Sequence, residues 1–180
     1  MGKPTVIIIC GPTASGKTAL SIDLAKKLNG EIISADSMQI YKDMNIGTAK
    51  PSLEEMDGVK HYLIDCVSPS TRYSVADFKK DATIAIEEII KKGKTPIVVG
   101  GTGLYVDSLI YGIDYNEMKV DMEYRQYLER QADEKGLSYL YDMAKNIDEE
   151  AMKKISPNDK KRICRVLEIY KSTGKTKTQL

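Results

Sequence analysis

The chain has little of several residue types on which common protein chemistries depend. His61 is the only histidine in 180 residues, which excludes catalytic or metal-binding schemes that need two. Cys10, Cys66 and Cys164 are odd in number, far apart and without a C-x-x-C pair. They therefore indicate neither a disulfide framework nor a zinc site, and we expect all three to be small core residues.

Long apolar runs are also missing. No run approaches the length of a membrane-spanning helix, and the apolar stretch after Thr5 is too short for the core of a signal peptide. We therefore predict a cytoplasmic protein that is not embedded in a membrane. The sequence leaves the oligomeric state open, and we favour a monomer.

The charge is small in total but unevenly distributed. The net charge is +1, whereas residues 156–180 alone carry 7 basic and 2 acidic side chains. Such a strip is suited to contacting phosphates of a polyanion, and it is equally consistent with a solvated helix face. The 42% apolar and 29% charged content is ordinary for a globular protein with one domain, or one domain and an appendage.

A phosphate-binding pattern, G-x-x-x-x-G-K-T, follows the apolar run at residues 6–10. Its residues are Gly11, Pro12, Thr13, Ala14, Ser15, Gly16, Lys17 and Thr18. The glycines let backbone N–H groups converge on an anion, Lys17 adds a charge, and the Thr18 hydroxyl can bind Mg²⁺. A helix that begins near Lys17 would add its positive dipole end.

Strand and helix patterns alternate after this loop. Leu20, Leu24 and Leu28 predict a helix that covers a sheet with its leucine face. Further strands are expected at 31–34, 61–67 and 96–100, and capping boxes at Ser52-x-x-Glu55 and Ser74-x-x-Asp77 start two helices. This order predicts an α/β fold with a parallel sheet flanked by helices.

Beyond Gly112 no β-rich run occurs, and helices are expected at 122–135, 138–146 and 148–154. A last helix should start at Ser156-Pro157 and turn Ile163, Val166, Leu167 and Tyr170 inward. We therefore predict an α/β core at 1–113, a helical insertion at 114–155, and a basic helix at 156–180 that returns to the core.

Acidic and hydroxyl side chains near the expected strand ends are the chemical candidates. Asp36 follows a strand and is either a catalytic acid-base group or a residue that orients Mg²⁺ or caps a turn. Asp65 lies in a predicted strand and is read as a structural or magnesium-shell carboxylate. Thr102, between glycines, could offer a hydroxyl to a phosphate. These residues alone do not separate a kinase, a motor, a GTPase and a transferase.

Several motifs together are more specific. They are GPTASGKT at 11–18, DSMQIY at 36–41, GTAKP at 47–51, HYLID at 61–65, SVADF at 74–78, GGTGLY at 100–105 and SPNDKKRICRVLEIY at 156–170. Over essentially the whole chain, in this order, they resemble the tRNA dimethylallyltransferase family. The resemblance implies a P-loop NTPase-like fold that transfers the prenyl group of dimethylallyl diphosphate, with Mg²⁺, to N6 of the adenosine next to the anticodon of tRNA.

The resemblance also assigns roles to residues. Asp36, Thr102 and Lys17 would be catalytic, the loop from Gly11 to Thr18 would bind the diphosphate, and Thr18 would hold the metal. The anticodon stem-loop would be contacted by Asp36, Ser37, Met38, Gln39, Thr102, Arg125, Lys160, Lys161, Arg162 and Arg165. The insertion after Gly112 would grip this stem-loop.

Three other functions stay open. A P-loop kinase for a nucleoside or small metabolite would use the same loop, although only Arg72 precedes residue 113 and no arginine-rich lid is present. An adenylate isopentenyltransferase would use a free nucleotide as acceptor. A non-catalytic RNA-binding fragment is the third, because members of the family continue well past the segment that ends at Leu180.

Overall fold

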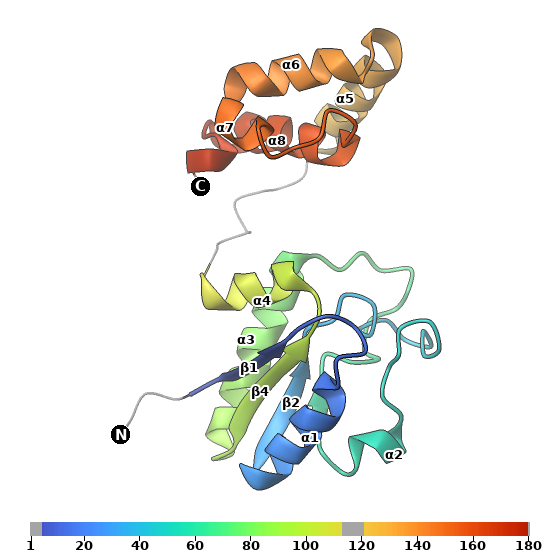
Figure 1. Ribbon diagram of the computed structural model, residues 1–180, viewed down its shortest axis with the longest axis vertical. Helices are drawn as coiled ribbons and strands as arrows, with labels where there is room; N and C mark the ends of the chain where they lie inside the picture. The colour runs from blue at the N-terminus through green and yellow to red at the C-terminus, as the bar shows by residue number, and fades with distance from the viewer. Residues whose placement is uncertain (1–4, 113–120, 180) are drawn as a thin grey trace. The chain divides into compact units, whose positions relative to one another are not determined.

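The computed structural model describes residues 5–112 and 121–179. Contacts within the chain divide it into two units, Met1–Asp114 and Tyr115–Leu180, drawn in blue to yellow and in orange to red in Figure 1. The expected division at residue 113 is thus close to the observed one. Residues 113–120, on which the predicted start of the insertion falls, lie outside the described residues.

The first unit is built on a parallel sheet. Its strands are β1 (Ile7–Cys10), β2 (Gly30–Ser34), β3 (His61–Tyr62) and β4 (Thr95–Gly100). They form one 4-stranded sheet in the order β1-β4-β2-β3, and every pairing is parallel. The predicted fold class is confirmed.

Helices cover both faces of this sheet (Figure 1). They are α1 (Lys17–Lys27), α3 (Val75–Lys91) and α4 (Gly103–Ile110), whereas the short α2 (Leu53–Met56) has no buried residue. The crossover through α1 runs from β1 past β4 to β2, whereas the crossover through α3 runs back from β3 to β4. Because such crossovers are right-handed, opposite directions place α1 and α3 on opposite faces.

The strand side chains alternate between the two faces. Ile32 and Ile97 pack with Ile22 and Ala25 of α1. On the other face a second cluster packs against α3 and α4, and its members include Ile33, Val98, Phe78, Ala82, Ile89, Tyr105 and Val106. Both predicted capping boxes are present, at Ser52 with Glu55 and at Ser74 with Asp77.

Two expectations for this unit are wrong in detail. The face of α1 buried on the sheet is Ser21, Ile22 and Ala25, whereas Leu20 and Leu28 are exposed. Small side chains are needed there because the helix comes close to the sheet, as a Cβ on Gly30 would lie 3.4 Å from Ala25 Cα. The strand expected at 61–67 stops at Tyr62, since Leu63 and Asp65 have φ of 55° and 53°.

The second unit is helical. It contains α5 (Met122–Lys135), α6 (Leu137–Ile147), α7 (Glu149–Met152), α8 (Lys160–Thr173) and the short 3₁₀ helix η1 (Lys177–Gln179). One core joins the four α-helices, and its buried residues include Leu128, Leu140, Ala144, Met152, Ile163 and Leu167. The expectation that residues 156–180 form a part separate from this unit is therefore corrected, because α8 supplies much of its apolar core.

The last helix also starts later than expected. Asp159, and not Ser156, caps α8 by accepting from Arg162 N, and the preceding residues form a turn. Ile163 and Leu167 are buried as predicted, whereas Tyr170 is 43% exposed. After α8, Thr178 donates through N and Oγ1 to the buried carboxylate of Asp148, at 2.9 and 2.6 Å.

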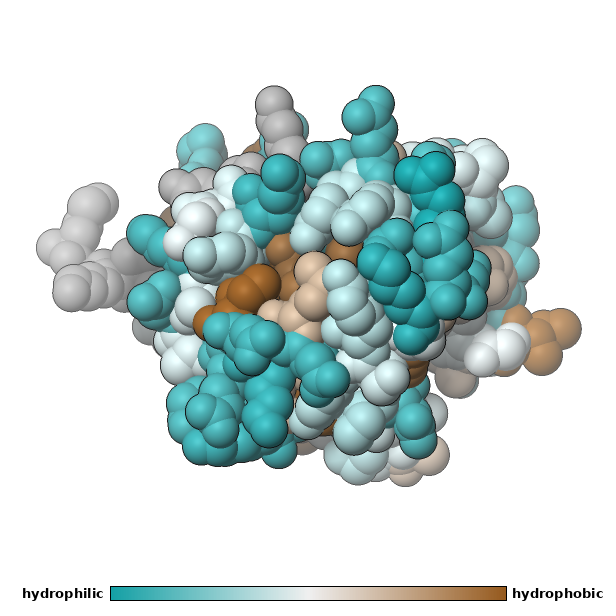
Figure 2. All heavy atoms as spheres, turned by 90° about the horizontal axis from the view of Figure 1, so that it is seen from above, coloured by the Kyte–Doolittle hydropathy of each residue, from teal (hydrophilic) through white to brown (hydrophobic). Residues whose placement is uncertain are grey.

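The cysteine prediction holds for one residue of three. Cys164 is buried, whereas Cys10 and Cys66 are exposed, and all three are free thiols. The face drawn in Figure 2 is mostly hydrophilic around a small apolar area. None of the helices in the described parts of the chain combines the length and apolar character that a membrane crossing needs.

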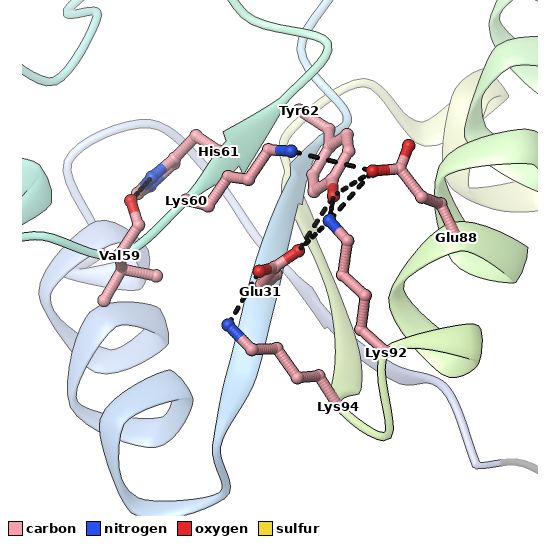
Figure 3. Close-up of polar contacts among 8 residues, drawn as sticks. All are labelled: Glu31, Val59, Lys60, His61, Tyr62, Glu88, Lys92 and Lys94. Carbon is pink, nitrogen blue, oxygen red and sulfur yellow. Dashed lines mark hydrogen bonds and ion pairs between the residues drawn. The ribbon is translucent and has the colours of Figure 1, made fainter.

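An ion-pair cluster lies at the amino ends of β2 and β4 (Figure 3). The buried Glu31 carboxylate accepts from Lys94 at 2.8 Å, from Tyr62 Oη at 2.8 Å and from Lys92 at 3.3 Å. Burial acts to raise the pKa of Glu31, but these hydrogen bonds outweigh it and lower the pKa from 4.5 to about 2. The cluster joins β2, β3 and the end of α3 at the edge of the sheet opposite the phosphate loop.

Candidate active site

The phosphate loop connects the end of β1 to the start of α1. Gly16 adopts φ 79° immediately before the helix, and Ala14 adopts φ 62°, a left-handed conformation that non-glycine residues adopt rarely. The loop is exposed apart from its half-buried ends, Gly11 and Lys17. The exposed amino end of α1 is suited to bind a phosphate, because its first N–H groups have no partner within the helix.

The Lys17 side chain lies along this loop. Its Nζ donates to Pro12 O at 2.5 Å and to Ser15 Oγ at 3.3 Å. The ammonium group is thus held at the loop rather than extended into solvent, which places a positive charge where a phosphate would lie.

A cleft of about 450 Å³ opens beside the loop. One side is formed by residues 14–19 and Ile22, and the other by Ala49, Pro51 and Glu55. The predicted metal ligand Thr18 lines it. The segment at 47–51, singled out in the sequence as a motif, is therefore a wall of the phosphate site.

The loops that follow β2 and β4 meet at one point. A Cβ on Gly100 would lie 2.1 Å from Ala35 O, so only glycine permits this approach. Thr102 N donates to Ala35 O at 3.3 Å, Ser37 N donates to Thr102 Oγ1 at 3.0 Å, and Thr102 Oγ1 donates to Ser37 Oγ at 3.3 Å. The structure therefore brings together Ser37 and Thr102, which are far apart in the sequence.

The phosphate loop lies next to this meeting point. β1 and β4 are neighbours, and a Cβ on Gly101 would lie 3.4 Å from Gly11 O. The helices after β1 and β4 lie on opposite faces of the sheet, and a crevice between such loops is where ligands bind in open α/β sheets. The loops at 11–16, 35–39 and 100–102 therefore form one site at the carboxyl edge.

Asp36 is half-buried at the centre of these loops. Its Oδ1 accepts from Met38 N at 2.9 Å and from Gln39 N at 3.2 Å, so the carboxylate does cap a turn, as one of the two sequence interpretations held. Within the described parts of the chain, Oδ2 has no hydrogen-bond partner. One oxygen is thus fixed and the other is available to accept a proton.

Tyr105 closes the inner side of this region. Its ring is buried and stacks on Phe78 with centroids 4.1 Å apart. Burial, followed by the nearby charges of Tyr41, Asp77 and Asp36, raises the pKa of Tyr105 to about 12. The phenol is therefore neutral at physiological pH.

Met38 and Gln39, two further residues of the DSMQIY motif, differ in whether their side chains are accessible to a ligand. Met38 is 46% exposed, and its side chain is accessible to a ligand. The Gln39 amide, by contrast, is occupied by Thr48 O, Ala49 O and Ser34 Oγ. The geometry supports a ligand contact for Met38 and a structural role for Gln39.

Asp65 is not in a strand but in an exposed turn. Its Oδ1 accepts from Lys50 Nζ at 2.5 Å and from Asp43 N at 3.1 Å. These hydrogen bonds lower the pKa of the Asp65 carboxyl. Of the two sequence interpretations, the geometry favours a structural carboxylate. The Lys50 side chain, which sequence reasoning missed although it lies in the GTAKP motif, is only 5% exposed.

Some of the basic residues predicted to bind RNA are engaged within the protein, and others are exposed. Arg125 binds the buried Glu168 through two hydrogen bonds, Nε to Oε1 at 2.6 Å and Nη2 to Oε2 at 2.9 Å, and so holds α5 against α8. Arg165 also reaches Glu168, at 3.4 Å. Lys161 and Arg162 are exposed on the first turn of α8. In the sequence, the single acidic residue within the basic helix α8, Glu168, could have indicated that it pairs with an arginine such as Arg125.

The side chains of the site could bind Mg²⁺ only together with the phosphates of a bound substrate. Among residues 5–112 and 121–179, no cluster of three or more His, Cys, Asp or Glu side chains is arranged to hold a metal. Thr18 Oγ1 would be a single oxygen ligand. This fits Mg²⁺, which retains several waters and is commonly shared with substrate phosphates.

Comparison with known proteins gives consistent matches. A family model described as IPP transferase matches residues 39–180. The tRNA dimethylallyltransferases of Acetivibrio thermocellus and Thermoanaerobacter sp. (strain X514) are 56% and 52% identical over 170 residues, which is 94% of this chain and 54% of each relative. The chain thus spans about half the length of the curated relatives it matches.

Solved structures of proteins with related names are also similar to this chain. The tRNA isopentenylpyrophosphate transferase of Bacillus halodurans is 49% identical, with a TM-score of 0.64, over 96% of this chain and 57% of that protein. A eukaryotic dimethylallyltransferase acting on tRNA is 38% identical, with a TM-score of 0.82, over 98% of this chain and 44% of that protein. The chain therefore has a P-loop NTPase-like fold and belongs to the IPP transferase family.

Proposed function

We propose that the chain carries the donor and acceptor loops of a tRNA dimethylallyltransferase. It would transfer a dimethylallyl group from dimethylallyl diphosphate to N6 of the adenosine next to the anticodon, in tRNAs that read codons beginning with U, and release diphosphate. The relatives named above support the activity. The observation that carries the proposal is the meeting of the phosphate loop with Asp36 and Thr102 at one edge of the sheet.

The donor side follows from the charge that develops in the reaction. As the allylic C–O bond breaks, negative charge grows on diphosphate and positive charge spreads over the prenyl group. The amino end of α1 and Lys17 Nζ stabilise the departing diphosphate. We propose that Thr18 would hold Mg²⁺ together with the diphosphate, where the metal would further neutralise the charge of the leaving group.

The acceptor side centres on Asp36. A C–N bond forms between the prenyl carbon and N6 while N6 loses a proton. An aromatic amine is a weak nucleophile, so a carboxylate that takes this proton assists the step. The unpartnered Oδ2 of Asp36 is suited to accept it, and the Thr102 hydroxyl, held by Ser37, is suited to hydrogen-bond the acceptor or the leaving diphosphate.

The acceptor loop would be held by the helical unit. An anticodon loop base is unpaired, so it unstacks into a pocket at lower cost than a base in a duplex. The exposed Lys161 and Arg162, together with Lys160 and Arg165, are the residues we propose to contact the RNA backbone. A contact from Arg125 has less support, because Glu168 occupies its guanidinium.

The test measures which donor and which acceptor the protein uses. Labelled dimethylallyl diphosphate is incubated with the chain and tRNA, or with AMP, while ATP is titrated as a competitor. We expect label on tRNA, none on AMP, and tighter binding of the prenyl diphosphate than of ATP. Label on AMP would indicate an adenylate isopentenyltransferase. Tighter ATP binding with phosphoryl transfer to a small acceptor would indicate a kinase, which family membership disfavours.

If the chain binds tRNA without transferring the prenyl group, the same assay is repeated with C-terminal residues appended to the length of the relatives. Transfer restored there supports the proposal, and transfer still absent supports an RNA-binding role. A cytoplasmic location and a monomeric state remain predictions of this proposal.

A further inference from the structure

The segment of residues 44–51, here called the cleft wall, faces the phosphate loop. Ala49 and Pro51 line the cleft opposite residues 14–19. Ala49 adopts φ 49°, a left-handed conformation in which a non-glycine residue is strained, so neighbouring contacts must hold it. The side chains of Gln39 and Lys50 supply these contacts.

Gln39 is the first. Its Nε2 donates to Thr48 O at 3.2 Å and to Ala49 O at 3.1 Å, and its Oε1 accepts from Ser34 Oγ at 3.3 Å. Both amide hydrogens are therefore used on the cleft wall, and the oxygen is anchored to the buried end of β2. An amide engaged in this way has no donor left for a nucleobase.

Lys50 is the second. Its side chain is 5% exposed, and its Nζ donates to Tyr41 O at 2.7 Å and to Asp65 Oδ1 at 2.5 Å. Asp65 also accepts from Asp43 N at 3.1 Å. A lysine buried in this way needs a nearby carboxylate, so the pair ties the cleft wall to the turn after β3.

From these contacts we infer that Gln39 and Lys50 are positioning residues for the diphosphate, which hold the cleft wall opposite the phosphate loop. Gln39 acts on the acceptor only through its backbone N–H to Asp36 Oδ1. Gln39 was expected among the residues that contact the anticodon stem-loop, whereas its side-chain amide is occupied by the cleft wall and Ser34. The identity of the prenyl donor rests on the proposed function. The binding of diphosphate in the cleft does not depend on it.

The test compares two nearly isosteric variants. Gln39→Glu directs a carboxylate at Thr48 O and Ala49 O, and Lys50→Met keeps the apolar stem but removes Nζ. The first variant loses the hydrogen bonds from Gln39 to Thr48 O and Ala49 O, and the second loses those from Lys50 to Tyr41 O and Asp65 Oδ1. We therefore expect the affinity of each variant for inorganic diphosphate to fall about tenfold. Hydrogen exchange should speed up at residues 44–51, and tRNA affinity should change less than about threefold.

The matched control is Lys27→Met, because Lys27 is exposed at the other end of α1 from the phosphate loop. It should leave diphosphate affinity as in the wild type. Urea unfolding of each variant separates this effect from a general loss of stability. Inorganic diphosphate reports on the cleft whatever the donor is. A protein that binds it but transfers no prenyl group, even with the C-terminal residues appended, therefore contradicts the proposed function and not this inference.

Unchanged diphosphate affinity in both variants would overturn the inference. If Gln39→Glu also lost tRNA affinity, Gln39 would instead be a residue that contacts the RNA. A wild-type chain that binds no diphosphate would overturn it as well. A fall in diphosphate affinity with faster exchange confined to the cleft wall would support it.

Discussion

At the scale of single residues, the site separates a donor group from an acceptor group. Lys17 begins α1 directly after the loop that follows β1, and Asp36 belongs to the loop after β2. Asp36→Asn keeps an oxygen that can accept from Met38 N and Gln39 N, so the turn should persist while the proton acceptor is lost. We expect single-turnover transfer to tRNA to fall roughly 10²–10⁴-fold with nearly unchanged diphosphate affinity.

Lys17→Ala is the comparison for this prediction. It removes a charge beside the phosphates in both the ground and the transition state, so both diphosphate affinity and rate should fall. If Asp36→Asn instead weakened diphosphate or Mg²⁺ binding and spared the transfer step, Asp36 would be a metal-shell residue.

Glu31 carries a pH-dependent contribution to stability. Its folded pKa of about 2 lies below the ordinary value of 4.5, so the stabilisation is fully present above about pH 5 and is lost as pH falls toward 2. Glu31→Gln should lower the free energy of unfolding at pH 7 by on the order of 2 kcal/mol. Urea titrations of both proteins at several pH values should show this difference shrinking below pH 5.

The control for Glu31 is an exposed ion pair. Glu150 pairs with Lys153 at 2.5 Å, and both side chains are more than half exposed. Glu150→Gln should change the free energy of unfolding by less than about 0.5 kcal/mol at every pH. Equal effects of the two substitutions would contradict a special role for the buried cluster.

At the scale of elements, the approach of two loops depends on a glycine at the end of β4. Gly100→Ala would place a Cβ 2.1 Å from Ala35 O, a contact that only a backbone shift can relieve. We expect a loss of roughly 1–3 kcal/mol in unfolding free energy, and reduced transfer because Asp36 and Thr102 move apart. Chemical denaturation and the transfer assay measure the two effects.

The neighbouring Gly103 provides a matched comparison. It is the first residue of α4, and a Cβ there would meet nothing within 4 Å. Gly103→Ala should therefore leave the unfolding free energy unchanged or raise it by up to about 1 kcal/mol. Equal destabilisation by both substitutions would show that crowding at Ala35 is not the cause.

The first turn of α8 should contribute to RNA affinity through charge. Lys161 is exposed, and Lys160 has only a 3.4 Å contact with Asp133. Changing both lysines to Gln should weaken tRNA binding and reduce the slope of log K against log salt by up to about two. The same change at Lys153 and Lys154 of the α7 end is the control, and an equal reduction there would make the effect one of net charge alone.

At the scale of the whole molecule, the two units have separate cores. Leu140 is fully buried in the helical unit, among residues of α5, α6 and α8. Leu140→Ala should destabilise that unit by about 2–5 kcal/mol and reduce tRNA affinity. Hydrogen exchange should speed up in α5–α8 and stay slow in the sheet, with diphosphate affinity preserved. Faster exchange in both units would show that they unfold together.

Features that depend on local pattern could be predicted from the sequence alone. The phosphate loop, the parallel sheet, the capping boxes at Ser52 and Ser74, and the helical character of the second unit all follow from spacing of a few residues along the chain. Such patterns are readable because periodicity and capping act between neighbours in sequence. The motif resemblance added the family, which the comparisons confirmed.

The contacts of each side chain, by contrast, became known only from the folded structure. It assigned Arg125 to the buried Glu168, Gln39 and Lys50 to the cleft wall, and Ala25 rather than Leu28 to the sheet. These outcomes depend on how closely segments distant in sequence approach one another, and on the high cost of leaving a buried polar group without a partner. Neither quantity is present in the local pattern, so the site's residue types could be predicted from the sequence whereas their partners could not.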